Sequence, residues 1–161
     1  MNTALATLYT NEASPELLQT YQKLPFTEQQ LSTFDEKTLA IIERQQAHRK
    51  AHPPIAIYRI AAQGSQTRNG GVIEQTTSPL KFKLASGQHI RAARKGDHAV
   101  YPDGTTAQIV TTAGAGFEHA ALVGSFLSNG DEIINTPQGS GLLLERKGVP
   151  LAEDFLPALE R

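Results

Sequence analysis

Several residue types that define common classes of protein are missing from this sequence. It has no cysteine, which excludes disulfides, thiolate nucleophiles and cysteine-based zinc sites. No apolar run approaches the roughly 18 residues that a membrane-spanning helix needs, and residues 1–18 lack the basic and continuously apolar segments of a secretory signal. The formal net charge is −1, so the charge balance points neither to nucleic acid nor to an anionic membrane. We therefore expect no stable membrane insertion and no nucleic-acid partner.

Glycine is also missing from the start of the chain, where the pattern is helical. The Ser-Pro-Glu run at 14–16 is typical of a helix start, and residues 27–30 carry a capping-box pattern. Apolar residues three or four apart continue between 31 and 42 as one helical face would, unless Asp35 begins a separate helix. Residues 1–53 are therefore predicted to form a helical N-terminal extension.

The amino-acid composition changes after His52-Pro53-Pro54, a run that breaks helices. All 13 glycines lie between Gly64 and Gly148, and short apolar or β-branched runs alternate with Asn-Gly, Asp-Gly and Ser-Gly pairs that predict tight turns. The runs expected to form strands are 55–60, 72–73, 80–84, 108–112 and 132–134. We predict a mainly-β domain over residues 54–145, followed by a C-terminal tail over residues 146–161.

A pattern of glycines recurs three times within this β-region. Gly64-Ser65, Asn69-Gly70 and Ile73 return as Gly124-Ser125, Asn129-Gly130 and Ile133, each shifted by 60 positions. A middle copy, with two extra residues before its turn, consists of Gly96-Asp97, Asp103-Gly104 and Ile109. An alanine precedes each leading glycine by three positions: Ala61, Ala93 and Ala121. Because one such hairpin is too short to bury its own apolar face, we expect the three to pack around a shared axis.

At these positions the sequence resembles the PAAR-repeat family, named for Pro-Ala-Ala-Arg followed shortly by Gly-Asp. The corresponding run is Arg91-Ala92-Ala93-Arg94-Lys95-Gly96-Asp97, with Arg91 in place of proline. The family's opening pattern, Gly-Asp-x-Thr-Ser-His-Gly-Gly, is similar to residues 64–71, and its closing Val-Gly-Asp with a later Cys-Gly is similar to residues 123–130. The likeness covers residues 58–138.

The resemblance implies a fold and a role. The fold is a conical domain of three β-hairpin units, here preceded by the helical extension. In that family the broad base sits on the trimeric valine-glycine-repeat spike of a type VI secretion system or a related contractile machine. The resemblance thus implies a non-enzymatic tip and adaptor protein, cytoplasmic before assembly and exported by the machine without a signal peptide. Residues 1–53 are a candidate attachment site for an effector or a chaperone.

The zinc site of that family is not reproduced in this sequence. The resemblance places Asn69 at a histidine ligand position and Asn129 at a cysteine ligand position, and Tyr101–Gly104 replaces Cys-Pro-x-His-Gly without either ligand. Zinc needs about four nitrogen or sulfur donors, so no cofactor is expected at the usual site. The alternative is a zinc site with an open position, built from the three histidines of the β-region: His89, His98 and His119.

Two further sets of residues have competing interpretations. Arg91, Arg94 and Lys95 form a basic cluster that is either a docking patch for an acidic partner or a solvated strand end. An alternative function, a small β-rich effector enzyme or a ligand-binding module, would use His89, Asp97, His98 and His119. No activated nucleophile accompanies Asp97 and Asp103, and aspartates in turns commonly bind backbone N–H groups. We therefore expect structural roles for the turn residues Gly64, Asn69, Gly70, Gly96, Asp97, Asp103, Gly104, Gly124, Asn129 and Gly130.

Overall fold

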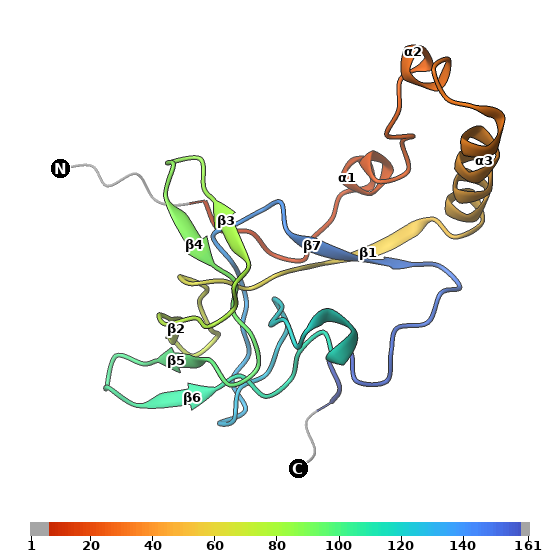
Figure 1. The fold of residues 1–161 in the computed structure, drawn as a ribbon. Helices are drawn as coiled ribbons and strands as arrows, with labels where there is room; N and C mark the ends of the chain where they lie inside the picture. Colours follow the sequence, from red (N-terminus) through yellow and green to blue (C-terminus); the bar gives the residue numbers. More distant parts are fainter. Residues whose placement is uncertain (1–6, 159–161) are drawn as a thin grey trace. The chain divides into compact units, whose positions relative to one another are not determined.

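The computed structural model describes residues 7–158, which form short helices followed by short strands (Figure 1). The helices are α1 (Pro15–Thr20), α2 (Glu28–Leu31) and α3 (Glu36–Ala51), and a single 3-10 turn, η1, spans Ala115–Phe117. The strands are β1 (Pro54–Arg59), β2 (Val72–Ile73), β3 (Lys81–Lys83), β4 (His89–Arg91), β5 (His98–Val100), β6 (Thr106–Gln108) and β7 (Leu142–Arg146). The strands pair in small antiparallel sheets, and more of the described chain lies in strands and bridges than in helices, which is compatible with a mainly-β class.

The chain divides into two compact units. The hairpin unit comprises the described residues up to Asn11, Tyr58–Leu143 and the described residues from Leu151 onward. The helical unit comprises Glu12–Ile57 and Leu144–Pro150. This division differs from the expected segments 1–53, 54–145 and 146–161, because the chain ends contribute to the hairpin unit and because β7 pairs with β1.

In the helical unit, each helix begins at a side-chain cap. The Ser14 hydroxyl accepts a hydrogen bond from the N–H of Leu17 at 3.1 Å. Thr27 and Gln30 form the predicted capping box, with bonds of 2.9 and 3.1 Å. Asp35 accepts a bond from the N–H of Thr38 at 2.7 Å, so α3 begins as a separate helix.

These separate starts limit the apolar face expected between residues 31 and 42. Ile42 is the one buried residue of α3, and its neighbour Ile41 is 50% exposed. The prediction of one continuous apolar face is therefore wrong. The helical unit also uses polar contacts: the Arg146 guanidinium donates to Gln22 Oε1 at 3.1 Å and to the His52 carbonyl at 3.0 Å.

In the hairpin unit, the three repeats adopt one local geometry. The leading glycines Gly64, Gly96 and Gly124 have φ values of 96°, 91° and 103°, a region that residues with a Cβ rarely occupy. Each donates its N–H to the carbonyl of the isoleucine on the returning strand, at 2.7, 3.0 and 2.8 Å. The side chain of the next residue (Ser65, Asp97 or Ser125) accepts a bond from the backbone N–H three positions before it, at 3.0, 2.9 and 2.9 Å.

The three repeats are joined by hydrogen bonds that close in a ring. Ala61 donates its N–H to the Ala121 carbonyl at 2.9 Å, Ala121 donates to Ala93 at 3.0 Å, and Ala93 donates to Ala61 at 2.8 Å. All three alanines are fully buried. A larger side chain would have no room where three backbones approach one another, which explains alanine at each position. We call Ala61, Ala93 and Ala121 the alanine ring.

A second cycle of pairings lies one step nearer the hairpin turns. Ile73 pairs with Ala99, Ile109 with Leu127, and Ile133 with Thr67, so each returning strand pairs with the outgoing strand of another hairpin. We call Ile73, Ile109 and Ile133 the isoleucine layer; each is at most 1% exposed. Together with the alanine ring they make up most of the core: Ala61, Ile73, Ala93, Ala99, Ala107, Ile109, Ala121, Leu127 and Ile133. The three hairpins are thus joined to one another by closed cycles of backbone pairing.

Some predicted strands are displaced or reduced. The expected strand at 108–112 begins earlier, as β6 at Thr106–Gln108, because pairing with β5 starts directly after the turn, with Thr106 opposite Val100. The expected strand at 132–134 forms only isolated bridges, Phe126 with Glu132 and Thr67 with Ile133. Among the described residues, no helix is long and apolar enough to cross a membrane.

Candidate functional site

Side chains from all three hairpins meet near the hairpin turns. The Tyr101 hydroxyl donates to Asp131 Oδ2 at 2.5 Å and accepts from Asn129 Nδ2 at 3.0 Å. The other Asp131 oxygen accepts from the N–H groups of Asn69 at 3.1 Å and Glu132 at 2.8 Å. These contacts join the first hairpin, through Asn69, to the second and the third. Asp131 is 2% exposed, so its charge is satisfied by hydrogen bonds instead of water.

Thr67 of the first hairpin completes this group, which we call the turn cluster (Thr67, Tyr101, Asn129 and Asp131). Its hydroxyl accepts from the Gly71 N–H at 2.8 Å and lies close enough to the Asp131 carboxylate to lower the pKa of that group. Glycine is required at 71 by space, since an added Cβ would lie 2.8 Å from Thr67 Oγ1 and 3.0 Å from the Tyr101 ring. The turn cluster therefore fills the region between the three turns with polar side chains in mutual contact.

The turn cluster shifts two pKa values in opposite directions. Burial raises the pKa of the Asp131 carboxyl, but hydrogen bonds from Thr67, Tyr101 and the backbone outweigh burial, so the pKa lies below its usual value. Burial also raises the pKa of the Tyr101 hydroxyl, and its bond to Asp131 raises it further. The carboxylate therefore stays ionised and the phenol stays protonated, which is the pairing that the Tyr101–Asp131 bond needs.

The residues at the turns do not fit a zinc ion. Both oxygens of Asp131 are already engaged, and Asn69 and Asn129 supply no imidazole or thiolate. The candidate histidines do not meet: His89 lies on β4, His98 on β5 and His119 after η1, and all three are exposed. Within residues 7–158, no group of three or more histidines, aspartates or glutamates could hold a metal ion.

The predicted aspartates have backbone partners in their own turns. Asp97 is 4% exposed and accepts from the Arg94 N–H at 2.9 Å and the Thr77 hydroxyl at 2.7 Å. Asp103 is exposed and accepts from the Thr105 N–H at 3.0 Å. Asp97 precedes β5, and the three histidines lie on β4, on β5 and after η1, so the residues of the alternative site come from different elements.

The predicted basic cluster lies on the strands that lead into the second hairpin. Arg91, Arg94 and Lys95 are all exposed. The Arg94 Nε donates to the Thr77 hydroxyl at 2.8 Å, whereas the contact from Arg91 to the Ser78 carbonyl is long, at 3.5 Å. Among the described residues, the side chain of Lys95 has no hydrogen-bond or ion-pair partner.

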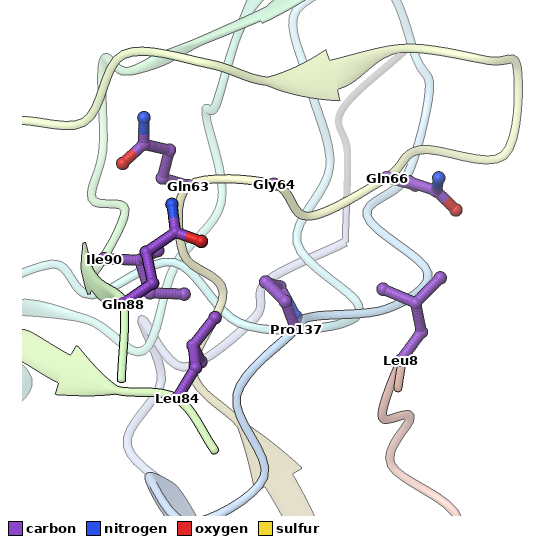
Figure 2. A pocket seen from close by; sticks show the side chains of 8 residues that line it. All are labelled: Leu8, Gln63, Gly64, Gln66, Leu84, Gln88, Ile90 and Pro137. Atoms are coloured by element: carbon purple, nitrogen blue, oxygen red, sulfur yellow. The ribbon is translucent and has the colours of Figure 1, made fainter. Parts of the chain in front are cut away.

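A shallow groove of about 380 Å³ opens beside the first hairpin (Figure 2). Leu84, Gln88 and Ile90 come from the β3–β4 hairpin, and Pro137 and Leu8 from segments distant in sequence. The remaining lining residues are Gln63, Gly64 and Gln66. The lining is apolar and amide-bearing and has no titratable side chain, so it offers no acid, base or nucleophile.

Three residues of the turn cluster, Thr67, Tyr101 and Asp131, were not among the predicted site residues, whereas Asn129 was. Asp131 occupies the position after the Asn-Gly turn, where the other two copies have Gly71 and Thr105. A carboxylate at one copy of a repeated position departs from the pattern, and that departure could have identified Asp131 from the sequence.

No protein-family model, curated protein or solved structure matches this chain.

Proposed function

We propose that this protein is a tip and adaptor protein that caps the trimeric valine-glycine-repeat spike of a type VI secretion system or a related contractile machine. The observation that carries this proposal is the closed alanine ring, in which Ala61, Ala93 and Ala121 hydrogen-bond in a cycle. A single chain with threefold internal pairing can present a similar surface to each protomer of a threefold-symmetric trimer. An enzyme or a lone ligand-binding module has no comparable need for that symmetry.

In this proposal the hairpins form a cone whose base contacts the spike. Within each hairpin the alanine ring lies at the end away from the turn, so the strands that enter the ring would supply the docking surface. Lys95 is exposed there, and its N–H bonds to the His119 carbonyl at 3.0 Å. Arg91 ends β4 and Arg94 forms an isolated bridge with Ala120 just after it, so both would add to the contact.

The turn cluster would take over the mechanical role of a metal at the opposite end. Its charge-assisted hydrogen bonds hold the turns of three hairpins together without an ion. The helical unit would then be the part available for attachment of an effector or a chaperone. The protein would be cytoplasmic before assembly and would leave the cell with the spike.

Stoichiometry with a purified trimeric spike fragment tests the proposal. Sedimentation or native mass spectrometry should find one chain for each trimer. Lys95→Glu should weaken the complex, and the matched control Lys37→Glu, on exposed helix α3, should not. Absence of association at micromolar concentration, or three chains bound to each trimer, would refute the proposal.

A further inference from the structure

The β3–β4 hairpin, in the connection between the first and second repeats, carries four basic side chains on one face. The pairing register places Lys81 directly opposite Arg91, and Lys83 directly opposite His89. Residues that alternate along a strand or lie opposite each other across a pair share one face of the sheet. All four side chains are exposed. We call Lys81, Lys83, His89 and Arg91 the basic face.

The basic face is unbalanced by acidic groups of this chain. Among the described residues, no carboxylate lies within ion-pair distance of any of its four members. Like charges directly opposite each other destabilise a strand pair. Lysine is a common guard against edge pairing, and both strands of the β3–β4 sheet are edges. The Arg91 carbonyl, however, is already bonded to the Gln63 N–H at 3.0 Å, so protection of an edge does not account for Arg91.

The opposite face of the same hairpin holds it in place. Ile90 is 4% exposed, and the Phe82 ring covers Gly141, where an added Cβ would lie 2.4 Å from a ring carbon. Leu84 borders the groove of Figure 2. The hairpin is therefore fixed by its apolar side while the basic face points to solvent, so its four side chains share a preorganised strand pair.

From this geometry we infer that the basic face is a docking surface for an extended acidic protein segment with carboxylates at alternate positions. Charges two apart on a strand are separated by about 7 Å, and cross-strand neighbours by about 5 Å. A strand bearing alternate Asp or Glu residues repeats at the same spacing as Lys81 and Lys83. The basic face shares Arg91 with the proposed spike contact, whereas Lys81 and Lys83 on β3 belong to the basic face alone, so the inference is tested at these two lysines.

A nucleic acid fits this face less well. Single-stranded nucleic acids are bound by basic grooves that also offer aromatic rings for base stacking. The only ring on β3 or β4 besides His89 is Phe82, which faces the other side of the hairpin. The formal net charge of the chain is −1, so the protein as a whole has no positive charge excess to attract a nucleic acid.

Binding of short peptides to the full chain at low salt tests the inference. The probe is a peptide of alternating threonine and glutamate, compared with the same peptide carrying glutamine in place of glutamate and with a single-stranded oligonucleotide of equal charge. Fluorescence anisotropy should detect the glutamate peptide alone, with an affinity that falls as salt is added.

A charge-reversal variant separates loss of binding from loss of folding. Lys81→Glu with Lys83→Glu should reduce affinity for the glutamate peptide by roughly tenfold or more, since two favourable charge contacts become repulsive. The same variant places glutamates opposite Arg91 and His89, so its resistance to urea should be equal to or above that of the parent. Lys37→Glu with Lys50→Glu on α3 makes the same charge change and should leave binding intact.

Three results would overturn the inference. One is failure of the glutamate peptide to bind, and another is tighter binding of the oligonucleotide. The third is unchanged peptide affinity in the Lys81→Glu, Lys83→Glu variant. None of these results bears on the stoichiometry with a trimeric spike, so the two proposals can fail separately.

Discussion

The hairpin unit and the helical unit are stabilised in different ways. The hairpin unit closes on itself through bonds between residues 28 to 60 positions apart, and its alanine ring is fully buried. In the helical unit each helix begins at a cap, in which a side chain bonds to a backbone N–H three positions later, and α3 buries only Ile42. Repeated tertiary pairing, and not local propensity, therefore holds the β-region together, whereas the helices depend on local capping and a few polar contacts.

The largest expected effect comes from removing side-chain volume from the isoleucine layer. Ile133→Ala should lower the free energy of unfolding by about 3 to 4 kcal/mol, because the residue is fully buried and its cavity cannot be filled by backbone. Urea unfolding followed by circular dichroism measures the loss. Ile41→Ala on α3, where the side chain is 50% exposed, is the matched control and should cost less than about 1 kcal/mol. Equal losses in the two variants would remove the distinction between the units.

Replacing the buried carboxylate of the turn cluster should have the next largest effect. Asp131→Asn should cost about 2 kcal/mol, because hydrogen bonds to a charged acceptor are lost or weakened. The pKa of Asp131 is lowered in the folded protein, so its contribution is complete above the unfolded pKa of about 3.9 and is lost as the pH falls through the folded value.

The pH dependence provides a second readout of the same variant. Between about pH 5 and pH 2, the stability of the parent should fall more steeply than that of Asp131→Asn, because only the parent must protonate this carboxylate. Glu74→Gln, at an exposed carboxylate of the same unit, is the control and should retain most of the parent's acid sensitivity. Parallel pH profiles for the parent and Asp131→Asn would show that the turn cluster does not link the hairpins.

A steric substitution next to the turn cluster should have a smaller effect. Gly71→Ala should cost about 1 to 3 kcal/mol, because the new Cβ would meet Thr67 Oγ1 and the Tyr101 ring. Gly116→Ala, where an added Cβ meets nothing within 4 Å, should be neutral or slightly stabilising. Thermal unfolding of the two variants compares them directly, and equal melting temperatures would contradict the packing described for Tyr101.

The smallest expected effect belongs to the helical unit. Thr27→Ala removes the capping box and should cost about 1 kcal/mol or less, confined to the turn that begins at Glu28. Hydrogen exchange should show faster exchange at Gln30, with no change at Ala61 or Ala93. Faster exchange throughout the hairpin unit would mean that the two units unfold together.

The positions with strict steric demands could be predicted from sequence, and these were the repeat glycines and alanines. Few residue types tolerate positive φ, as at Gly64, Gly96 and Gly124, or the close backbone approach at the alanine ring. The repeat can therefore be recognised from the amino-acid sequence. The caps at Ser14 and Thr27 were predictable for the same reason, since each needs one kind of side chain at one offset.

Features that depend on tertiary neighbours could not be read in this way. The basic face joins Lys81 and Lys83 to His89 and Arg91, and only the register of β3 and β4 brings them together. The turn cluster required knowing that Tyr101 of one hairpin reaches Asp131 of another, at 2.5 Å. The end of α1 at Thr20 also depends on contacts of Tyr21 and Gln22 with Arg146, which lies far along the chain.

Hydrogen exchange at the alanine ring tests the closed pairing of three hairpins most directly. The amides of Ala61, Ala93 and Ala121 each donate to the next member, so no one of them can open without breaking the cycle. Residue-resolved exchange should find all three among the slowest amides of the chain, with similar protection, exchanging only through global unfolding. Exchange at any one of the three at the rate of an exposed loop would contradict the ring and, with it, the threefold basis of the proposed function.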